Sequence, residues 1–185
     1  MRQDPDVILV GEIRDEDTAT MAFRAAMTGH QVYSTLHTNS AIGAIPRLLD
    51  IGIVPDVLSG NIIGIVAQRL MRRLCKYCKK PHEATPDECR LLGVDAAKAP
   101  TLHGAVGCDH CEFQGFKGRL AIIEILKFDP EFDELIAHRA TLRELLTSAV
   151  SKGFRTLADD AIRRALDGST SLDEVARVID LSDRM

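Results

Sequence analysis

The sequence predicts an α/β fold at its N-terminal end, followed by a small cysteine-rich module and a helical C-terminal part. Three observations predict it: two apolar runs at 7–10 and 31–36 separated by a helical pattern, two C-x-x-C pairs, and several helix-capping sequences after residue 140. A chain of 185 residues fits one large domain or two small ones. The expected segments are 1–74, 75–117 and 118–185.

Composition places few limits on function. The hydrophobic share of 45% is sufficient for ordinary cores, and the net charge is −4. Tryptophan is absent and only two tyrosines are present, which weakens any interpretation based on base stacking. We therefore expect no nucleic-acid partner. No apolar run approaches the length of a membrane span and no charged-then-apolar leader precedes the first strand, so we expect a soluble, intracellular protein.

The first predicted unit is strand–helix–strand. The continuous apolar run 7–10 is typical of a strand covered on both faces. Asp17 or Thr18 is expected to cap the following helix, whose alanines share one face and which ends at Gly29. The second strand, 31–36, follows at a spacing that leaves room for a helical crossover, so the two strands are expected to be parallel.

Two further elements complete the N-terminal part. Ser40 is expected to cap a helix that runs to Leu49, and Pro46 should bend that helix or shorten its start. The segment 62–70 fits either a strand or a buried helix. Its isoleucine and valine content favours the strand.

A carboxylate and an imidazole follow the two predicted strands. Glu12 ends the first strand and His37 ends the second, and ligands of open parallel sheets bind at the carboxyl ends of the strands. A carboxylate there can hold a magnesium ion or orient an attacking water, and a neutral imidazole can contact a terminal phosphate. Alternatively, Glu12 pairs with Arg14 on a loop and His37 is an ordinary strand-end histidine. Their matching positions favour the functional interpretation.

The amino-acid sequence around these two residues resembles that of a known protein family. The stretches RQDPDVILVGEIRDEDTA and TGHQVYSTLHTNSA resemble the Walker B and histidine-box region of the secretion ATPase superfamily, the hexameric motors of type II secretion and type IV pili. The resemblance continues through AQRLMRRLC and GRLAIIEIL and covers essentially the whole chain. It implies the C-terminal part of a RecA-like P-loop NTPase core that hydrolyses ATP with Mg²⁺.

The resemblance also implies roles and partners. Glu12 would match the Walker B glutamate and His37 the histidine of the His box, both as catalytic residues. The residues that would support the nucleotide and magnesium site are Arg14, Asp15, Thr35 and Thr38. The intact protein would be a hexamer in the cytoplasm, peripheral to the inner membrane. It would act with the inner-membrane platform protein and other cytoplasmic-membrane components of a secretion or pilus system.

One departure from the family matters. A phosphate-binding loop needs G-x-x-x-x-G-K-[ST], and no Gly-Lys dipeptide occurs in this sequence. The acidic segment and the arginines that the family carries upstream of Walker B are missing as well. We therefore expect the C-terminal piece of a longer ATPase, inactive when isolated. The alternative is a non-catalytic, zinc-stapled module for assembly or binding.

Four of the five cysteines form two C-x-x-C pairs. These are Cys75 with Cys78, and Cys108 with Cys111. Two such pairs complete a closed tetrahedral site for structural Zn²⁺, although the intervening segment 79–107 exceeds the usual gap. Disulfides are a poorer explanation in a reducing compartment, and neither pair opens a helix after a strand as redox pairs do. Zinc would also staple a segment too polar to bury much surface.

Other residues near these pairs are less specific candidates for metal binding. His103 and His110 lie close enough in sequence to replace a thiolate, and Cys89 in a short capped helix is expected to pack. The resemblance implies a four-cysteine module in the type II and pilus-extension branches, not in the retraction branch. The sequence does not choose between secretion and pilus extension.

A run of six cations surrounds the first cysteine pair without an acid among them. Its members are Arg69, Arg72, Arg73, Lys76, Lys79 and Lys80. The simplest interpretation is a solvated face or salt bridges to a neighbouring subunit. The alternative is contact with anionic lipid headgroups at a membrane.

The remaining sequence predicts one strand and several helices. A strand is expected over 119–126, and Thr141 begins a capping box. A second helix should carry Leu157 and end at Gly168, and Ser171 should cap a third. One apolar stripe per helix is typical of a small bundle that acts as scaffold.

Overall fold

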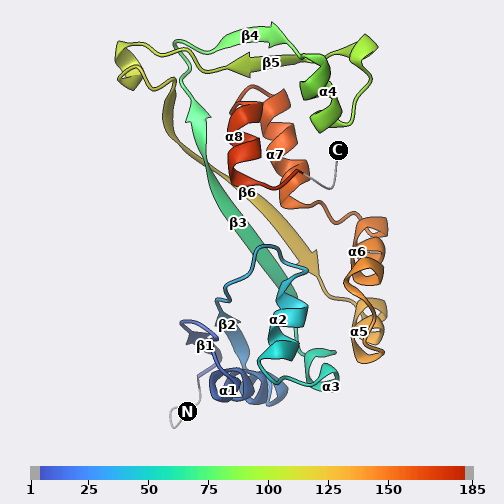
Figure 1. Ribbon diagram of the computed structural model, residues 1–185. Helices are drawn as coiled ribbons and strands as arrows, with labels where there is room; N and C mark the ends of the chain where they lie inside the picture. The colour runs from blue at the N-terminus through green and yellow to red at the C-terminus, as the bar shows by residue number, and fades with distance from the viewer. Residues whose placement is uncertain (1–4, 182–185) are drawn as a thin grey trace. The chain divides into compact units, whose positions relative to one another are not determined.

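The chain folds into two compact units. The computed structural model describes residues 5–181. Within these residues, unit 1 comprises 5–67 and 125–154, and unit 2 comprises 68–124 and 155–181 (Figure 1). Each unit is therefore built from two separate stretches of the chain. The functional segmentation into 1–74, 75–117 and 118–185 stays a prediction.

Unit 1 begins with the predicted strand–helix–strand motif. Strands β1 (Val7–Val10) and β2 (Gln31–Ser34) are parallel, with Val7 opposite Gln31, and helix α1 (Glu16–Met27) connects them (Figure 1). The parallel pairing confirms the prediction from the crossover length. β2 is shorter than the predicted 31–36.

Helix α1 begins earlier than the sequence suggested. Asp15 is extended (φ −138°, ψ 166°), and its Oδ1 accepts a hydrogen bond from the Thr18 backbone amide at 2.8 Å. The expected cap at Asp17 or Thr18 is therefore wrong. Both residues lie inside the first turn, where the acid at Asp17 still favours the helix dipole. The end of the helix is as expected, with Thr28 at the cap and Gly29 at φ +94°.

The first strand is not covered on both faces in this chain. Val7 is 57% exposed and Leu9 78% exposed, whereas the alternate residues are partly buried. The sheet of β1 and β2 has two strands, and its outward face carries these apolar side chains. The expectation of burial on both faces is therefore wrong for the described residues, because none of their elements covers that face.

Two short helices follow β2. Helix α2 (Ala44–Asp50) begins after Gly43, whose amide donates to Ser40 Oγ at 3.1 Å. Ser40 thus closes a turn ahead of the helix and does not cap it directly, which corrects the predicted start. Pro46 lies in the first helical turn, where no intrahelical bond from its nitrogen is required. Helix α3 (Pro55–Leu58) follows.

The core of unit 1 joins both of its chain stretches. Helix α5 (Pro130–Ala137), which the sequence analysis did not predict, places Phe132 and Ile136 in the core, and α6 (Leu142–Ser151) adds Leu145 and Ala149. These side chains pack with α1, α2 and α3 residues in one buried cluster. Thr141 caps α6 with the predicted capping box to Glu144.

Strands β3 (Gly64–Leu74) and β6 (Phe116–Lys127) pair with each other, and each contributes residues to both units. The strand interpretation of 62–70 is therefore confirmed over the helical one. β6 likewise confirms the strand expected over 119–126. The 11-residue length of β3 carries the chain to the first cysteine, Cys75.

Unit 2 contains a pair of antiparallel strands that was not predicted from the sequence. Strands β4 (Lys80–Glu83) and β5 (Thr101–Gly104) are antiparallel (Figure 1). Between them lie α4 (Pro86–Leu92) and a 3₁₀ turn at Ala96–Lys98. A second 3₁₀ turn, Asp109–Cys111, lies within the second cysteine pair.

The C-terminal helices do not form the single bundle that we expected. Helices α7 (Leu157–Leu166) and α8 (Leu172–Val178) pack together in unit 2, whereas α6 packs with α5 in unit 1. The boundary between the two units falls after Phe154, so α6 and α7 belong to different units. The helical boundaries themselves agree with the signals expected at Gly168 and Ser171, and Thr156 caps the start of α7.

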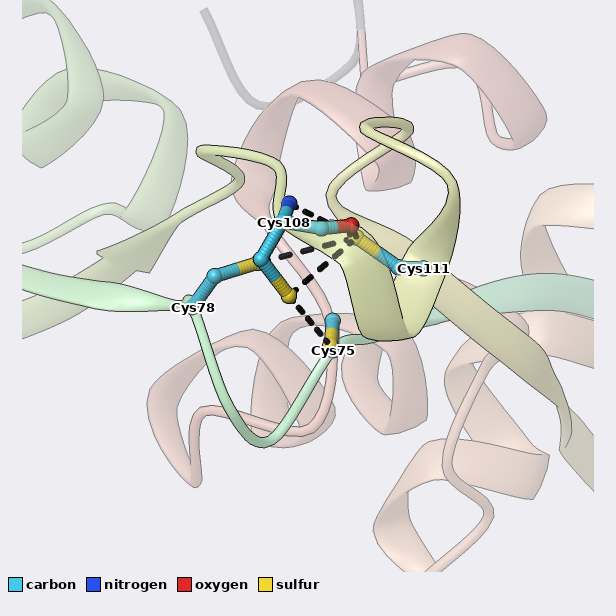
Figure 2. Close-up of side chains that lie close together, drawn as sticks. All are labelled: Cys75, Cys78, Cys108 and Cys111. Atoms are coloured by element: carbon cyan, nitrogen blue, oxygen red, sulfur yellow. Dashed lines mark hydrogen bonds between the residues drawn. The ribbon is translucent and has the colours of Figure 1, made fainter.

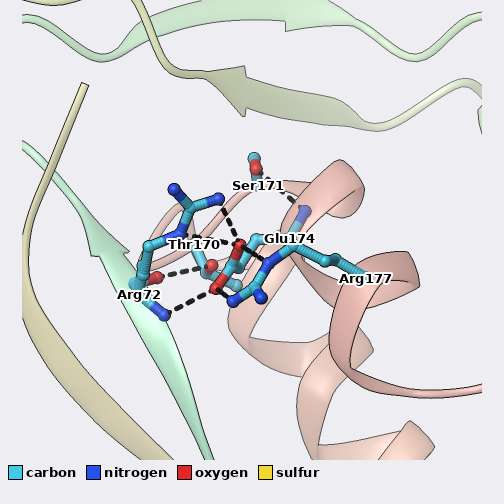
Figure 3. Close-up of polar contacts among 5 residues, drawn as sticks. All are labelled: Arg72, Thr170, Ser171, Glu174 and Arg177. Atoms are coloured by element: carbon cyan, nitrogen blue, oxygen red, sulfur yellow. Dashed lines mark hydrogen bonds and ion pairs between the residues drawn. The ribbon is translucent and has the colours of Figure 1, made fainter. Parts of the chain in front are cut away.

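Within unit 2, α8 is tied to β3 by a buried carboxylate (Figure 3). The Glu174 side chain is fully buried and accepts hydrogen bonds from the Arg72 backbone amide at 2.9 Å and from the Arg72 guanidinium at 2.6 Å. Arg177 donates to the same carboxylate at 2.6 Å. Thr170 Oγ1 adds a bond to the Arg72 carbonyl at 2.8 Å.

None of the helices described in residues 5–181 has both the length and the apolarity needed to cross a membrane.

Candidate functional site

The two residues predicted at the strand ends meet in unit 1. Glu12 lies two residues beyond β1 and His37 three beyond β2, and His37 Nε2 is 2.6 Å from Glu12 Oε1. Arg14 Nε contacts the other oxygen, Oε2, at 2.5 Å. The Glu12 side chain is 20% exposed, whereas His37 is 86% exposed. The carboxylate is therefore held in place while the imidazole is open to a ligand.

Hydrogen bonds between the two loops bring these residues together. The Ile13 amide donates to the Thr35 carbonyl at 3.0 Å, and Thr35 Oγ1 donates to the Gly11 carbonyl at 2.7 Å. The pairing of the parallel strands thus continues for several residues past their ends. Thr35, predicted as a supporting residue, positions the loop that carries Glu12.

The other predicted supporting residues have different positions. Asp15 caps α1, and the hydrogen bonds from the Thr18 backbone amide and hydroxyl lower the pKa of its carboxyl. It is therefore ionised and engaged in the helix. Thr38 Oγ1 donates to the Ser40 carbonyl at 3.0 Å. Both lie in the loops that carry Glu12 and His37.

One oxygen of the pair lacks a donor. Glu12 Oε1 is buried and receives no aligned hydrogen bond from residues 5–181, although His37 Nε2 lies close to it. A buried carboxylate oxygen without a donor is costly unless a cation or a water satisfies it. A carboxylate beside an imidazole could hold an ordered water or one ligand position of a hydrated magnesium ion.

The four cysteines of the two C-x-x-C pairs meet in unit 2 (Figure 2). Their sulfur atoms all lie within 4.8 Å of one another. The separations are 3.9 Å between Cys75 and Cys108, 3.8 Å between Cys78 and Cys111, and 3.8 Å between Cys108 and Cys111. A tetrahedral zinc with bonds of about 2.3 Å places its sulfur ligands about 3.8 Å apart. The cluster therefore has the dimensions of a tetrahedral metal site.

Backbone amides surround the sulfurs. Gly107 N donates to Cys78 Sγ at 3.3 Å, and Gly115 N donates to Cys111 Sγ at 3.2 Å. Gly107 has φ +114°, and a Cβ there would meet the Phe113 carbonyl at 2.7 Å, so only glycine fits this turn. Such amides stabilise thiolates, which are the form that binds metal.

The pKa values of the thiols reflect the opposing effects of burial and of these backbone hydrogen bonds. Burial raises the pKa of Cys78 to about 11 and also raises that of Cys108. Burial has the same effect on Cys111, but hydrogen bonds from the amides of Cys108 and Gly115 outweigh it and lower its pKa to about 7. Among these thiols the two amides thus favour the thiolate form at Cys111.

The alternative ligands identified from the sequence do not join this cluster. All five cysteines are free thiols, and the sulfur separations are almost twice a disulfide bond. His110 stacks on Tyr77 with ring centroids 4.0 Å apart, and His103 packs against Gly168. Cys89 is buried in α4, which confirms its predicted packing role.

The cationic run near the first pair is only partly free. Arg72 pairs with Glu174, which lies 102 positions away and could not be identified from the sequence. Lys79 Nζ donates to the Gly168 carbonyl at 2.7 Å. Glu174 itself looked like the fourth residue of a capping sequence, but its carboxylate turns inward to the two arginines. No local signal distinguishes these two uses.

Comparison with known proteins places the chain in a family. Residues 1–177 match the model for type II/IV secretion system proteins. The chain is 51% identical to the type II secretion system protein E of Pseudomonas aeruginosa over 96% of its own length and 35% of that relative. It is 44% identical to the type IV pilus assembly ATPase PilB of Thermus thermophilus, over 97% of this chain and 21% of PilB. The chain thus spans about a third or less of these relatives.

Solved structures agree on the fold. The pilus retraction motor PilT with bound ADP has a TM-score of 0.65 and 26% identity, over 97% of this chain and 41% of that one. The Legionella pneumophila ATPase DotB has a TM-score of 0.61 over 96% of this chain and 39% of that one, at 24% identity. These neighbours confirm the α/β fold. With a family match that spans nearly all of its residues, the chain belongs to the type II/IV secretion system protein family.

Proposed function

We propose that this chain is part of a secretion or pilus-assembly ATPase and supplies one face of its nucleotide site from a partial RecA-like core. The observation that carries the proposal is the meeting of Glu12 and His37 beyond the carboxyl ends of two parallel strands. This is where nucleotide-binding sheets place their ligands. The family match supports it, because relatives in that family are secretion and pilus ATPases.

The residues of this face would have distinct roles. Glu12, held by Arg14 and backed by the loop contacts of Thr35, orients a water or a water-bound cation through Oε1, the oxygen that faces His37. His37 is exposed and reaches the terminal phosphate. Bound ATP and Mg²⁺ would supply the transferable phosphoryl group and offset its charge. A correctly placed acid–base group contributes about 10²–10⁴-fold to rate.

The phosphate-binding loop must come from another segment. The sequence contains no G-x-x-x-x-G-K-[ST], and a carboxylate–histidine pair cannot cradle a triphosphate by itself. The isolated chain therefore neither binds ATP tightly nor hydrolyses it. In the complete ATPase, we propose a hexamer in the cytoplasm, peripheral to the inner membrane and working on a platform protein there.

The four cysteines have a structural role in this proposal. Sulfur separations near 3.8 Å and backbone amides on the sulfurs support a closed Zn²⁺ site that holds the turn after β3 against the turn before β6. Four protein ligands leave no open position for substrate, so the metal stabilises the fold and takes no part in hydrolysis.

A second candidate function is a zinc-stapled module without catalysis. The observation that favours it is the engagement of Asp15, the nearest other predicted carboxylate in residues 5–181, as the cap of α1. In that case Glu12 and His37 would only bind each other and Arg14.

A chimera separates the two functions. This chain replaces the matching region of the 51% identical type II secretion system protein E of Pseudomonas aeruginosa, and steady-state ATP turnover is measured. The proposal expects turnover by the chimera, a loss of about 100-fold or more with Glu12→Gln, and none from the isolated chain. A matched control is Glu16→Gln, which changes an exposed carboxylate in the first turn of α1. Equal turnover with Glu12→Gln and Glu16→Gln would favour the second function.

A further inference from the structure

Unit 2 contains a cavity of about 580 Å³ beside the four-cysteine cluster. Four cations line it: Arg73 from the end of β3, Lys76 and Lys79 from the turn between β3 and β4, and Lys117 from the start of β6. The backbone of Gly168 and Ser169, between α7 and α8, forms another wall. None of the acidic residues between 5 and 181 lines it. We call this cavity the basic pocket.

Two of these cations are positioned by the backbone. Lys79 Nζ donates to the Gly168 carbonyl at 2.7 Å, and Lys117 Nζ donates to the His110 carbonyl at 2.8 Å. An ammonium group carries three donors, so each retains two for a ligand. The lysines are thus held at the pocket without their charge being neutralised by these contacts.

The donors match a phosphate group better than a carboxylate. A phosphate carries up to two negative charges and at least three strong acceptor oxygens. The Arg73 guanidinium offers a fork that binds phosphate through two parallel hydrogen bonds, and the ammonium groups add point charges. Four cations from three separate segments exceed what a carboxylate with two oxygens needs. The volume also falls within the range of small-ligand sites.

We propose that the basic pocket binds a phosphate-bearing anion. The proposal concerns a site in unit 2 and does not depend on ATP hydrolysis at Glu12 and His37. The phosphate could belong to a lipid headgroup or to a soluble phosphate ester, because the pocket recognises the chemistry that they share. The competing explanation is that these cations only offset the charge of four thiolates around a metal, since Cys75 also lines the pocket.

Binding to two probes tests the proposal in the full 185-residue chain. One arm follows inorganic phosphate by ³¹P NMR titration, and the other follows co-sedimentation with phosphatidylcholine vesicles with and without phosphatidylglycerol. The pocket variant is Arg73→Gln with Lys76→Gln, because both side chains are exposed and neither makes a described backbone contact. The matched control is Lys80→Gln, an exposed lysine next to Lys79 that does not line the pocket.

The proposal expects the pocket variant to bind at least one probe about 25-fold more weakly, from about fivefold for each cation removed. Lys80→Gln should change binding by less than about twofold, because its charge lies outside the pocket. Binding to vesicles alone assigns a lipid source, and binding to inorganic phosphate assigns a soluble one. Equal weakening by the pocket and control variants, or no binding of the unmodified chain to either probe, would overturn the proposal. Lys117→Gln, which leaves the β3–β4 turn untouched, must weaken binding in the same direction.

Discussion

The buried carboxylate of Glu174 gives the sharpest stability prediction. Glu174→Gln removes the charge that both Arg72 and Arg177 surround, while it keeps the size of the side chain (Figure 3). Breaking a buried ion pair by removing one partner costs about 3–5 kcal/mol. Arg72 and Arg177 are 48% and 57% exposed, so both cations can turn to water and the cost should lie at the low end, about 3 kcal/mol.

Acid titration should report on the same contact. Burial alone would raise the pKa of Glu174, but hydrogen bonds from Arg177 and Arg72 lower it from its usual 4.5 to about 2. A depressed folded-state pKa contributes stability above pH 4.5 that is lost as the pH falls from 4.5 towards 2. The difference corresponds to about 3 kcal/mol, in agreement with the ion-pair estimate.

Hydrogen exchange measures this loss locally. We expect amides of 70–74 and 170–178 to exchange faster in Glu174→Gln by the equivalent of about 3 kcal/mol. Asp173→Asn, an exposed neighbour in the same helical turn, should cost less than about 1 kcal/mol through the helix dipole. Equal protection in the two variants, or the same acid sensitivity between pH 4.5 and 2 in Glu174→Gln and unmodified protein, would refute the reasoning.

Three further predictions concern other parts of the chain. The protein should contain one zinc per chain by elemental analysis, and a strong chelator should raise amide exchange across 75–111 but not in unit 1; unchanged exchange there would count against a structural metal. Thr141→Ala should remove the capping box of α6 and destabilise it by about 1 kcal/mol, seen as faster exchange at Leu145, whereas the exposed Thr147→Ala should have little effect. Phe132→Ala should lower the free energy of unfolding of unit 1 by about 3–5 kcal/mol in urea, because the ring is 1% exposed; a smaller loss than about 1 kcal/mol would contradict its core role.

Local signals in the sequence predicted local structure well. The capping box at Thr141 is a short pattern whose partner, Glu144, lies three residues away, and it is formed. The meeting of Glu12 and His37 was predictable because parallel strands end at the same edge of a sheet. The meeting of the four cysteines was predictable because two C-x-x-C pairs together supply the four ligands of one tetrahedral metal site.

Features that depend on distant residues were missed or misjudged. Glu174 fits a local capping sequence, yet its partner Arg72 lies 102 positions away. Asp15 rather than Asp17 caps α1, because Asp15 is the last residue with extended backbone before the helix. Composition alone does not determine at which residue the extended backbone ends. Helix α5 was overlooked although Asp129-Pro130 is a helix-start signal, with Asp129 accepting from the Phe132 amide.

The central claim is that Glu12 and His37 act together on one phosphate. In the chimera with the Pseudomonas aeruginosa relative, ATP turnover is measured for Glu12→Gln, for His37→Ala and for the double variant. Residues that act as a unit lose activity together, so the double variant should be no slower than the slower single variant within about threefold. Losses that multiply, or turnover that survives in both single variants, would contradict the account.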